Sequence, residues 1–220
     1  MDTRGLLTLR EGTIIEHEIE IKRSRFIATL ARTNTPQEAR TIINDVRSTH
    51  PAARHVCSAY LIHEQGQSPH QHSSDDGEPA GTAGNPMLEV LRNNDVWNVC
   101  AVVTRYFGGI LLGTGGLVRA YSSAVSEALI RAPRARLKDM QVYETHLPLG
   151  EAGRIEAEIR SLGAHVMNVT WGNDVTLQAA ICEPQKQALF ECVARVTQGQ
   201  SAFQLVTTTL VEVDEISASS

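Results

Sequence analysis

The sequence predicts an α+β protein with two domains, and three observations lead to this fold class. The 220 residues are enough for two domains of roughly 100 residues each. Hydrophobic residues make up 42% of the chain and charged residues 20%, as in an ordinary globular protein. Strand-like and helix-like periodicities both occur, in a different order in the two halves. We therefore expect an N-terminal domain over residues 1–137, a C-terminal domain over residues 138–214 and a frayed tail over residues 215–220.

The first half is expected to open with two strands and a helix. Isoleucines and a histidine alternate with charged residues over residues 15–22, the period-two pattern of a half-buried strand. The basic segment 22–25 separates this strand from a second, apolar one at residues 26–30. A helix is expected to begin within residues 35–38, where threonine can act as N-cap, proline fills the first helical position and glutamate the third.

The rest of the first half surrounds a glycine-rich run. Residues 55–62 predict a buried strand, the polar residues 63–74 a long loop, and residues 82–91 a helix. Residues 96–105 are nearly all apolar, which predicts the central strand of the sheet. Apolar residues then recur at helical spacing from the end of the glycine-rich run to residue 132, just before a proline.

The second half predicts the element order β-α-β-β-α-β, which is that of the ferredoxin-like split unit. Periodicity places strands at residues 141–147, 166–171, 175–181 and 203–213, and helices at residues 150–162 and from Glu183-Pro184 onward. The segment Gly172-Asn173-Asp174 between the two middle strands is typical of a hairpin turn.

Charge and composition narrow the function classes. Residues 1–138 carry 16 lysines and arginines against 14 aspartates and glutamates, a net charge of +2, whereas residues 139–220 carry 4 against 11, a net charge of −7. A polyanion is therefore expected to meet the first half. No apolar run reaches the roughly 20 residues of a membrane span, and the N-terminus lacks a secretory pattern. We expect a soluble cytoplasmic protein with four reduced cysteines and no cofactor.

The glycine-rich run is the first candidate site. Its five glycines are Gly108, Gly109, Gly113, Gly115 and Gly116. Thr114 is expected at the N-cap or in the first turn of the following helix, and Arg105 and Arg119 flank the run. Bare N–H groups and the helix N-terminus predict a site for phosphate or another anion. Alternatively, the glycines only permit close packing of the helix on the sheet. No Lys-Ser/Thr pair follows them, so the run is not a P-loop.

The acidic segment Asp75, Asp76 and Glu78 is the second candidate site. Three carboxylates within four positions are compatible with a hard-cation site or a general base. In the alternative interpretation, they accept hydrogen bonds from backbone N–H groups at the start of the next helix, which Thr82 is placed to cap.

Two further constellations are weaker candidates. His70 and His72 are spaced like a metal-ligating pair, but their polar surroundings favour a solvated loop, and we predict no metal site. His55 and Cys57 fall on the same face of a predicted strand, which is compatible with a Cys/His nucleophile pair or with chance.

Several motifs carry a resemblance to a known family. Ser24-Arg25-Phe26, His55-x-Cys57-x-Ala59-Tyr60, SDDGEPAGTAGNPML at residues 74–88 and VTRYFGGILLGTGGLVRAY at residues 103–121 resemble the YigZ/IMPACT family. The resemblance spans both halves. It implies an N-terminal domain like domain 2 of ribosomal protein S5, and a ferredoxin-like C-terminal domain like the last domain of the translocation elongation factor.

The resemblance also implies a role in translation or stress regulation. Eukaryotic relatives bind a ribosome-associated activator of a stress kinase. We expect a non-enzymatic binding protein that contacts RNA, the ribosome or a translation-associated protein through its two loops. The expected contact residues of the glycine-rich region are Arg105, Tyr106, Gly108, Gly109, Gly113, Thr114, Gly115, Gly116 and Arg119. Those of the acidic loop are Asp75, Asp76, Glu78 and Thr82. The alternatives are an enzyme that holds a phosphorylated small molecule or nucleotide in the glycine-rich loop, and a pure protein-interaction module.

Overall fold

The computed structural model describes residues 5–64 and 67–214, so the predicted frayed tail lies outside the described residues. The described chain forms two β-sheets and five α-helices, which confirms the α+β class. The strands are β1 Leu6–Leu9, β2 Ile14–Ile21, β3 Ser24–Arg32, β4 His55–Ile62, β5 His70–Ser74, β6 Val99–Tyr106, β7 Arg134–Leu147, β8 His165–Trp171, β9 Val175–Ile181 and β10 Gln204–Asp214. The helices are α1 Pro36–Thr49, α2 Gly84–Asn93, α3 Thr114–Arg131, α4 Ala152–Ser161 and α5 Lys186–Val196, and a short 3₁₀ helix covers Glu183–Gln185.

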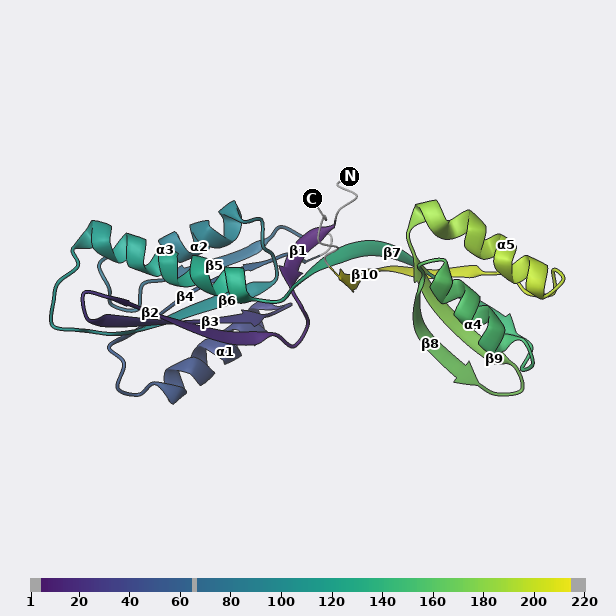
Figure 1. The fold of residues 1–220 in the computed structure, drawn as a ribbon, viewed down its shortest axis with the longest axis horizontal. Helices are drawn as coiled ribbons and strands as arrows, with labels where there is room; N and C mark the ends of the chain where they lie inside the picture. Colours follow the sequence, from purple (N-terminus) through teal and green to yellow (C-terminus); the bar gives the residue numbers. More distant parts are fainter. Residues whose placement is uncertain (1–4, 65–66, 215–220) are drawn as a thin grey trace. The chain divides into compact units, whose positions relative to one another are not determined.

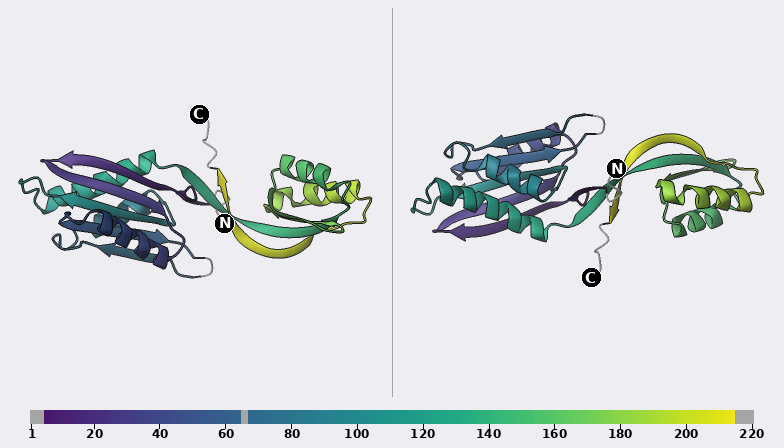
Figure 2. Two further views of the ribbon diagram at one scale, coloured as in Figure 1. Left: turned by 90° about the horizontal axis from the view of Figure 1, so that it is seen from below. Right: turned by 90° about the horizontal axis from the view of Figure 1, so that it is seen from above.

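The N-terminal sheet has the strand order β2-β3-β6-β4-β5, with helices on both faces (Figure 1). Strand β6 is central, as its apolar sequence predicts. Helices α2 and α3 cover one face and α1 the other, and Figure 2 shows the sheet from each side. The first face holds the larger core, whose fully buried side chains include Phe26, Met87 and Tyr121. Val46, Val56 and Val102 belong to the smaller core under α1.

The hairpin between β2 and β3 turns in two residues. Ile21 pairs with Ser24, so Lys22 and Arg23 form the tip. Both have positive φ, 48° and 63°, as a type I′ turn requires. Asn-Gly is the preferred sequence for this turn. A bulky residue in the left-handed region instead raises the conformational energy of the backbone by about 1–2 kcal/mol.

Two short strands differ from the sequence prediction. The predicted loop at residues 63–74 is wrong in part, because His70–Ser74 pairs with β4 as strand β5. As an edge strand it pairs through its backbone on one side and needs little apolar character, so its polar sequence resembles a loop. Strand β1 was not predicted at all. It pairs with β7 and makes a parallel bridge from Leu7 to Val96.

The second sheet contains the predicted β-α-β-β-α-β series from β7 to β10. Strand β7 pairs with β10 and with β9. Strand β9 in turn lies between β7 and β8. Strand β7 begins at Arg134, well before the predicted start at residue 141. The core includes Tyr143, Ile155, Leu177 and Leu189. Within the described chain, no helix combines the length and the apolar character that a membrane crossing needs.

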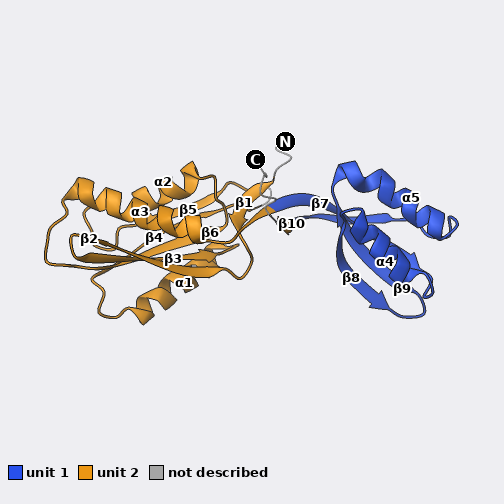
Figure 3. Cartoon of the chain, in the orientation of Figure 1, with its two compact units in different colours: residues 1, 137–211 blue, residues 2–136, 212–220 orange. Residues whose placement is uncertain are grey.

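The chain forms two compact units (Figure 3). One contains residues 137–211. The other contains residues 2–136 together with the chain from residue 212 onward. In this second unit, the Glu212 carboxylate accepts a hydrogen bond from the backbone N–H of Glu11 at 3.0 Å and one from Nη1 of Arg32 at 3.3 Å. The last part of the chain therefore rejoins the unit in which the chain begins.

Candidate functional site

The predicted site residues gather at one end of the N-terminal sheet. The strand register aligns Phe26 of β3, Arg105 of β6 and His55 of β4. The hairpin tip 22–23, the glycine-rich loop 107–113 that follows β6 and the acidic loop 75–83 that follows β5 all leave the sheet at this end. The topology thus brings together segments that are far apart in the sequence.

Asp75 holds the start of helix α2. Its carboxylate accepts hydrogen bonds from the backbone N–H groups of Gly81, Ala83 and Gly84 at 2.8–3.0 Å. Partial burial opposes ionisation, but these three donors outweigh it and hold the pKa of Asp75 below its usual range. Thr82, predicted as the cap, instead donates its hydroxyl to the Pro79 carbonyl at 2.6 Å. The cap prediction for Thr82 is wrong because the preceding loop folds Asp75 back onto the same N–H groups.

Replacing Asp75 by alanine is expected to lower the free energy of unfolding by about 1–2 kcal/mol, the usual cost of a lost helix cap. Urea unfolding followed by circular dichroism measures this change. Because the pKa of Asp75 is lowered by folding, its contribution is present above the unfolded pKa of about 3.9 and is lost as pH falls through the folded-state pKa. The gap between wild type and variant should therefore shrink below about pH 4.

The control for this experiment is Asp45→Ala. Asp45 is exposed on α1, and its side chain forms no hydrogen bond with any described residue, so the change should stay within about 0.5 kcal/mol. Equal losses in the two variants would contradict the capping role of Asp75.

Asp76 joins the acidic loop to α1 and β4. Its carboxylate binds both terminal nitrogens of Arg47, at 2.8 and 3.3 Å, and accepts the backbone N–H of Val56 at 2.7 Å. Burial opposes ionisation here too, but the Arg47 guanidinium and the Val56 N–H keep the pKa of Asp76 low. The carbonyl of Asp76 lies 2.8 Å from Nδ1 of His55. The whole residue is therefore engaged in joining these elements.

Glu78 is the buried carboxylate of the loop. Its Oε1 accepts hydrogen bonds from Nη1 of Arg105 at 2.6 Å and from the Tyr121 hydroxyl at 2.8 Å. The side chains of Glu78 and Arg105 are only 3% and 7% exposed. This cluster connects the acidic loop to the end of β6 and to α3, so it is the direct link between the acidic loop and the elements on either side of the glycine-rich loop.

Cys57 lies beside this cluster. Its Sγ is 3.0 Å from the Asp75 carbonyl and 3.4 Å from the Tyr121 hydroxyl, and burial raises the pKa of the thiol to about 12. A thiol with such a pKa stays protonated and is a poor nucleophile at neutral pH. Since His55 bonds to Asp76 instead, the geometry does not support a Cys57/His55 pair.

The glycine-rich loop is fixed to the hairpin tip at Gly108. Its N–H donates to Oγ of the buried Ser24 at 3.1 Å. A Cβ at Gly108 would stand 2.0 Å from the carbonyl carbon of Arg23, so no other residue fits there. This is close packing of the loop on the hairpin tip, which differs from the packing of the helix on the sheet foreseen as the alternative role of the glycines. The neighbouring Tyr106 hydroxyl lies 2.9 Å from Nδ1 of His50.

The N-terminus of α3 is open. Thr114 is its first residue, as expected, and the N-cap is Gly113, with φ of 73° and no side chain to accept a hydrogen bond. A Cβ at Gly115 would meet no atom within 4 Å, so the first turn is sterically free. Gly113, Thr114 and Gly115 are exposed, so this turn faces solvent, whereas a Cβ at Gly116 would stand 3.0 Å from Cβ of Leu112.

The basic residues of the hairpin tip and of the first turns of α3 have no internal partner. Lys22, Arg23 and Arg119 are exposed and form no hydrogen bond or ion pair with the residues that the structure describes. Arg25, also in the basic segment, differs because it pairs with Glu18 at 2.7 Å. The glycine-rich loop adds exposed apolar side chains at Phe107, Ile110 and Leu111. The resulting surface is cationic and partly apolar.

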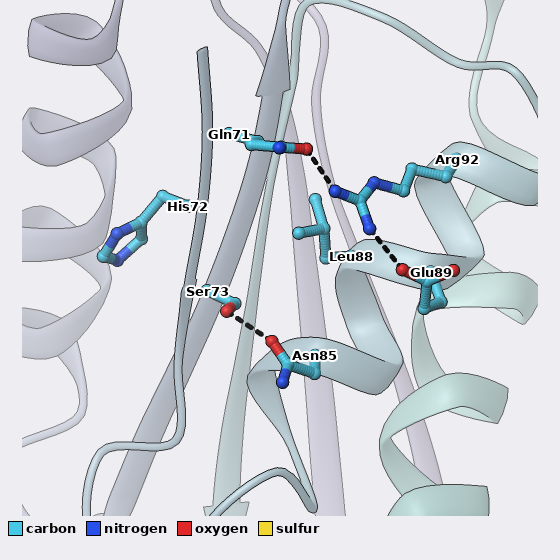
Figure 4. Close-up of a pocket in the computed structure, with 7 residues that line it drawn as sticks. All are labelled: Gln71, His72, Ser73, Asn85, Leu88, Glu89 and Arg92. Atoms are coloured by element: carbon cyan, nitrogen blue, oxygen red, sulfur yellow. Dashed lines mark hydrogen bonds and ion pairs between the residues drawn. The ribbon is translucent and has the colours of Figure 1, made fainter. Parts of the chain in front are cut away.

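A groove that the sequence did not predict lies between β5 and α2 (Figure 4). Its volume is about 460 Å³, and it is lined by Gln71, His72, Ser73, Asn85, Leu88, Glu89 and Arg92. Arg92 bonds to both Gln71 and Glu89 across it, and Ser73 bonds to Asn85 at 2.7 Å. The spacing of Asn85, Glu89 and Arg92 marks a polar stripe on α2 that could have revealed it. Of the candidate residues, His72 lines this groove, whereas those of the acidic and glycine-rich loops do not.

The N-terminal unit matches a known domain family. The Impact N-terminal domain covers residues 22–129, from the hairpin tip to α3. IMPACT family member YvyE of Bacillus subtilis is 43% identical over 84% of this chain and 85% of its own length. IMPACT family member YigZ of Escherichia coli is 41% identical over 77% of this chain and 81% of its own length. A crystal structure of a hypothetical protein, 34% identical, covers 92% of this chain and 98% of its own, with a TM-score of 0.61.

These matches define an α+β protein with an Impact N-terminal domain followed by a second domain. The chain belongs to the IMPACT family, as its motifs indicated. A further solved structure, described as that of the two-domain translational regulator Yih1, is 32% identical over 56% of this chain and 48% of its own, with a TM-score of 0.40.

Proposed function

We propose that this protein is a non-enzymatic RNA-binding protein that acts in translation. Its contact surface comprises the hairpin tip 22–23, the glycine-rich loop 107–113 and the first turns of α3. One observation carries the proposal: the three carboxylates of the acidic loop have internal partners, whereas Lys22, Arg23 and Arg119 have none among the described residues. A surface with such unpaired cations attracts phosphates.

The acidic loop has a supporting role in this proposal. Asp75 caps α2, Asp76 binds Arg47, and Glu78 neutralises Arg105. These contacts shield the three carboxylates from an approaching polyanion and hold the glycine-rich region in place. The loop then contributes to binding by positioning the residues that touch the ligand.

The turn chemistry of the hairpin tip supports the same conclusion. A two-residue type I′ turn is most stable with Asn-Gly, yet this chain has Lys22-Arg23 with positive φ at both positions. Backbone strain of this kind persists mostly where the side chains serve a function. Two long cationic side chains at an exposed tip suit contact with phosphates.

The second unit has a different role. Residues 139–220 carry a net charge of −7, which repels RNA, so this unit acts on a protein partner or steadies the complex. We also propose that this second unit has a ferredoxin-like fold, which its element order and strand order support. For the N-terminal unit we propose an S5-domain-2-like fold, which the family resemblance supports. Both are compatible with a translation protein, although a fold alone does not specify a function.

Binding to RNA is expected to depend on salt with a slope of about −2 in log affinity against log salt, because three cations contribute roughly 0.7 each on a single strand. The double variant Lys22→Asn/Arg23→Gly should reduce that slope to about −0.7. The same variant installs the preferred turn residues, so its free energy of unfolding should rise by about 1 kcal/mol. Fluorescence anisotropy with a labelled RNA and urea unfolding measure the two quantities.

The opposite signs separate function from folding, because weaker binding by a more stable protein cannot result from unfolding. Lys138→Gln, which removes one positive charge from the unit that contains residues 137–211, serves as the control and should leave the slope unchanged. A flat salt response of the wild type, no binding at low salt, or equal binding of polyglutamate would contradict RNA binding.

The alternative is an enzyme that holds a phosphorylated small molecule at the N-terminus of α3. The open first turn after Gly113 favours it. The engagement of Asp75, Asp76 and Glu78 in internal contacts disfavours it, because a base or magnesium ligand must be available. A rise in melting temperature with nucleotides or sugar phosphates and magnesium would support the enzyme instead.

A further inference from the structure

Phe107 is an exposed aromatic residue with a rigid support. It follows β6 directly, and 44% of its surface is exposed. The guanidinium carbon of Arg105 lies over its ring, 5.6 Å from the centroid, and also over the buried ring of Phe26 at 5.4 Å. Arg105 is in turn fixed by Glu78. Arg105 therefore lies over one face of the Phe107 ring, while a large part of the residue stays exposed.

The cationic hairpin tip lies next to this ring. Gly108, the residue after Phe107, donates its N–H to Ser24 and packs against the carbonyl group of Arg23. Arg25 of β3 pairs with Tyr106, the last residue of β6. Phe107 comes directly after Tyr106, so the chain there runs toward the hairpin tip. The topology thus places an exposed aromatic ring beside Lys22 and Arg23.

We propose that Phe107 is a stacking platform for a base of single-stranded RNA, while Lys22 and Arg23 hold the neighbouring phosphates. This inference rests on the RNA-binding function proposed above and specifies the form of RNA that is bound. An aromatic ring beside cations is the combination that binds single strands without sequence preference. Arg119 lies on the adjacent helix and extends the cationic surface.

The chemistry selects a single strand over a duplex and over an acidic peptide. In a duplex the bases are stacked on one another and their faces are hidden, so a ring at the protein surface gains nothing from them. An acidic peptide can pair with the cations, but its carboxylates offer no flat apolar face to the ring. A single strand supplies both phosphates and free base faces.

The buried ion pair between Glu78 and Arg105 holds the Phe107 ring in a fixed orientation. A platform that is already oriented loses little conformational freedom when a base stacks on it. The series Glu78, Arg105 and Phe107 provides this orientation, with the carboxylate fixing the guanidinium and the guanidinium fixing the ring. The acidic loop thereby affects the ligand site without touching the ligand.

The test compares three labelled probes by fluorescence anisotropy: a 12-nucleotide single-stranded adenine RNA, an abasic strand of the same length and a duplex. The wild-type protein should bind the adenine strand on the order of tenfold more tightly than the abasic strand. Phe107→Leu should remove this preference and leave abasic binding unchanged, whereas Phe107→Trp should retain it. Ile130→Ala, near the C-terminal end of α3 and 75% exposed, should retain it as well.

Different outcomes overturn the two proposals. Equal wild-type binding of the adenine and abasic strands, tighter binding of the duplex, or a Trp variant as weak as the Leu variant would overturn the stacking role and leave RNA binding in place. No salt-dependent binding of any probe would overturn the RNA-binding function itself. Circular dichroism melts of each variant verify that folding is unchanged, as expected for exposed positions.

Discussion

Replacing Gly108 with alanine is expected to lower the free energy of unfolding by about 3 kcal/mol or more. The new Cβ would stand 2.0 Å from the carbonyl carbon of Arg23 and 2.1 Å from its oxygen. These atoms belong to the backbone of a two-residue turn and cannot move aside as a side chain would. Overpacking of this kind costs about 1–3 kcal/mol when neighbours relax, and more when they cannot. Urea unfolding measures the loss, and RNA binding should weaken with it, because the hairpin tip separates from Phe107.

Gly115→Ala is the matched control. A Cβ at Gly115 meets no atom within 4 Å, and the residue lies in the first turn of α3, where alanine favours the helix. We expect its stability to be unchanged or higher by less than about 1 kcal/mol. If both alanine variants were equally stable, the close contact between the glycine-rich loop and the hairpin tip would be refuted.

Replacing Glu78 with alanine is expected to cost about 3–5 kcal/mol, because it leaves a buried guanidinium without its counter-charge. Arg105 would lose its carboxylate and Tyr121 its acceptor, and Nε of Arg105 already has no hydrogen-bond partner in the described structure. Thermal and urea unfolding measure the loss. The Phe107 ring should also lose its fixed support.

The control for Glu78 is Glu18→Ala, which breaks the exposed ion pair with Arg25. Those side chains are 42% and 50% exposed, and such a surface pair contributes less than about 1 kcal/mol. A comparable loss in both variants would mean that burial does not govern the strength of the Glu78 pair.

The fold was predictable where a pattern is local. The central position of β6 follows from an apolar run, and the start of α1 follows from Thr35, whose hydroxyl accepts the Glu38 N–H at 3.2 Å as its sequence position indicates. Strand β5 was missed because an edge strand draws its stability from backbone pairing and carries no hydrophobic signal.

The proximity of the acidic and glycine-rich loops was predictable, whereas the contacts of the individual residues were not. The motifs identify the acidic and glycine-rich loops, yet nothing in the sequence shows which partner each carboxylate takes. Asp75 and Asp76 are adjacent and chemically identical, but one caps α2 and the other binds Arg47. The exposure of Phe107 also depends on tertiary packing, because an aromatic residue after a buried strand is as typical of a core. The Lys22-Arg23 turn lacks the Asn-Gly signature, so its geometry was equally hidden.

The return of the chain at Glu212 bears on the order in which the protein is completed during synthesis. Arg32 is made 180 residues before Glu212, so its buried guanidinium waits for its carboxylate partner until the residues between them have been made. Residues 137–211 must emerge in between, which makes their unit an insertion within the first. Domains generally fold as units in the order of their synthesis. The first unit can therefore form its core early, but it closes only when the inserted unit has been made and the last strand has come back to it.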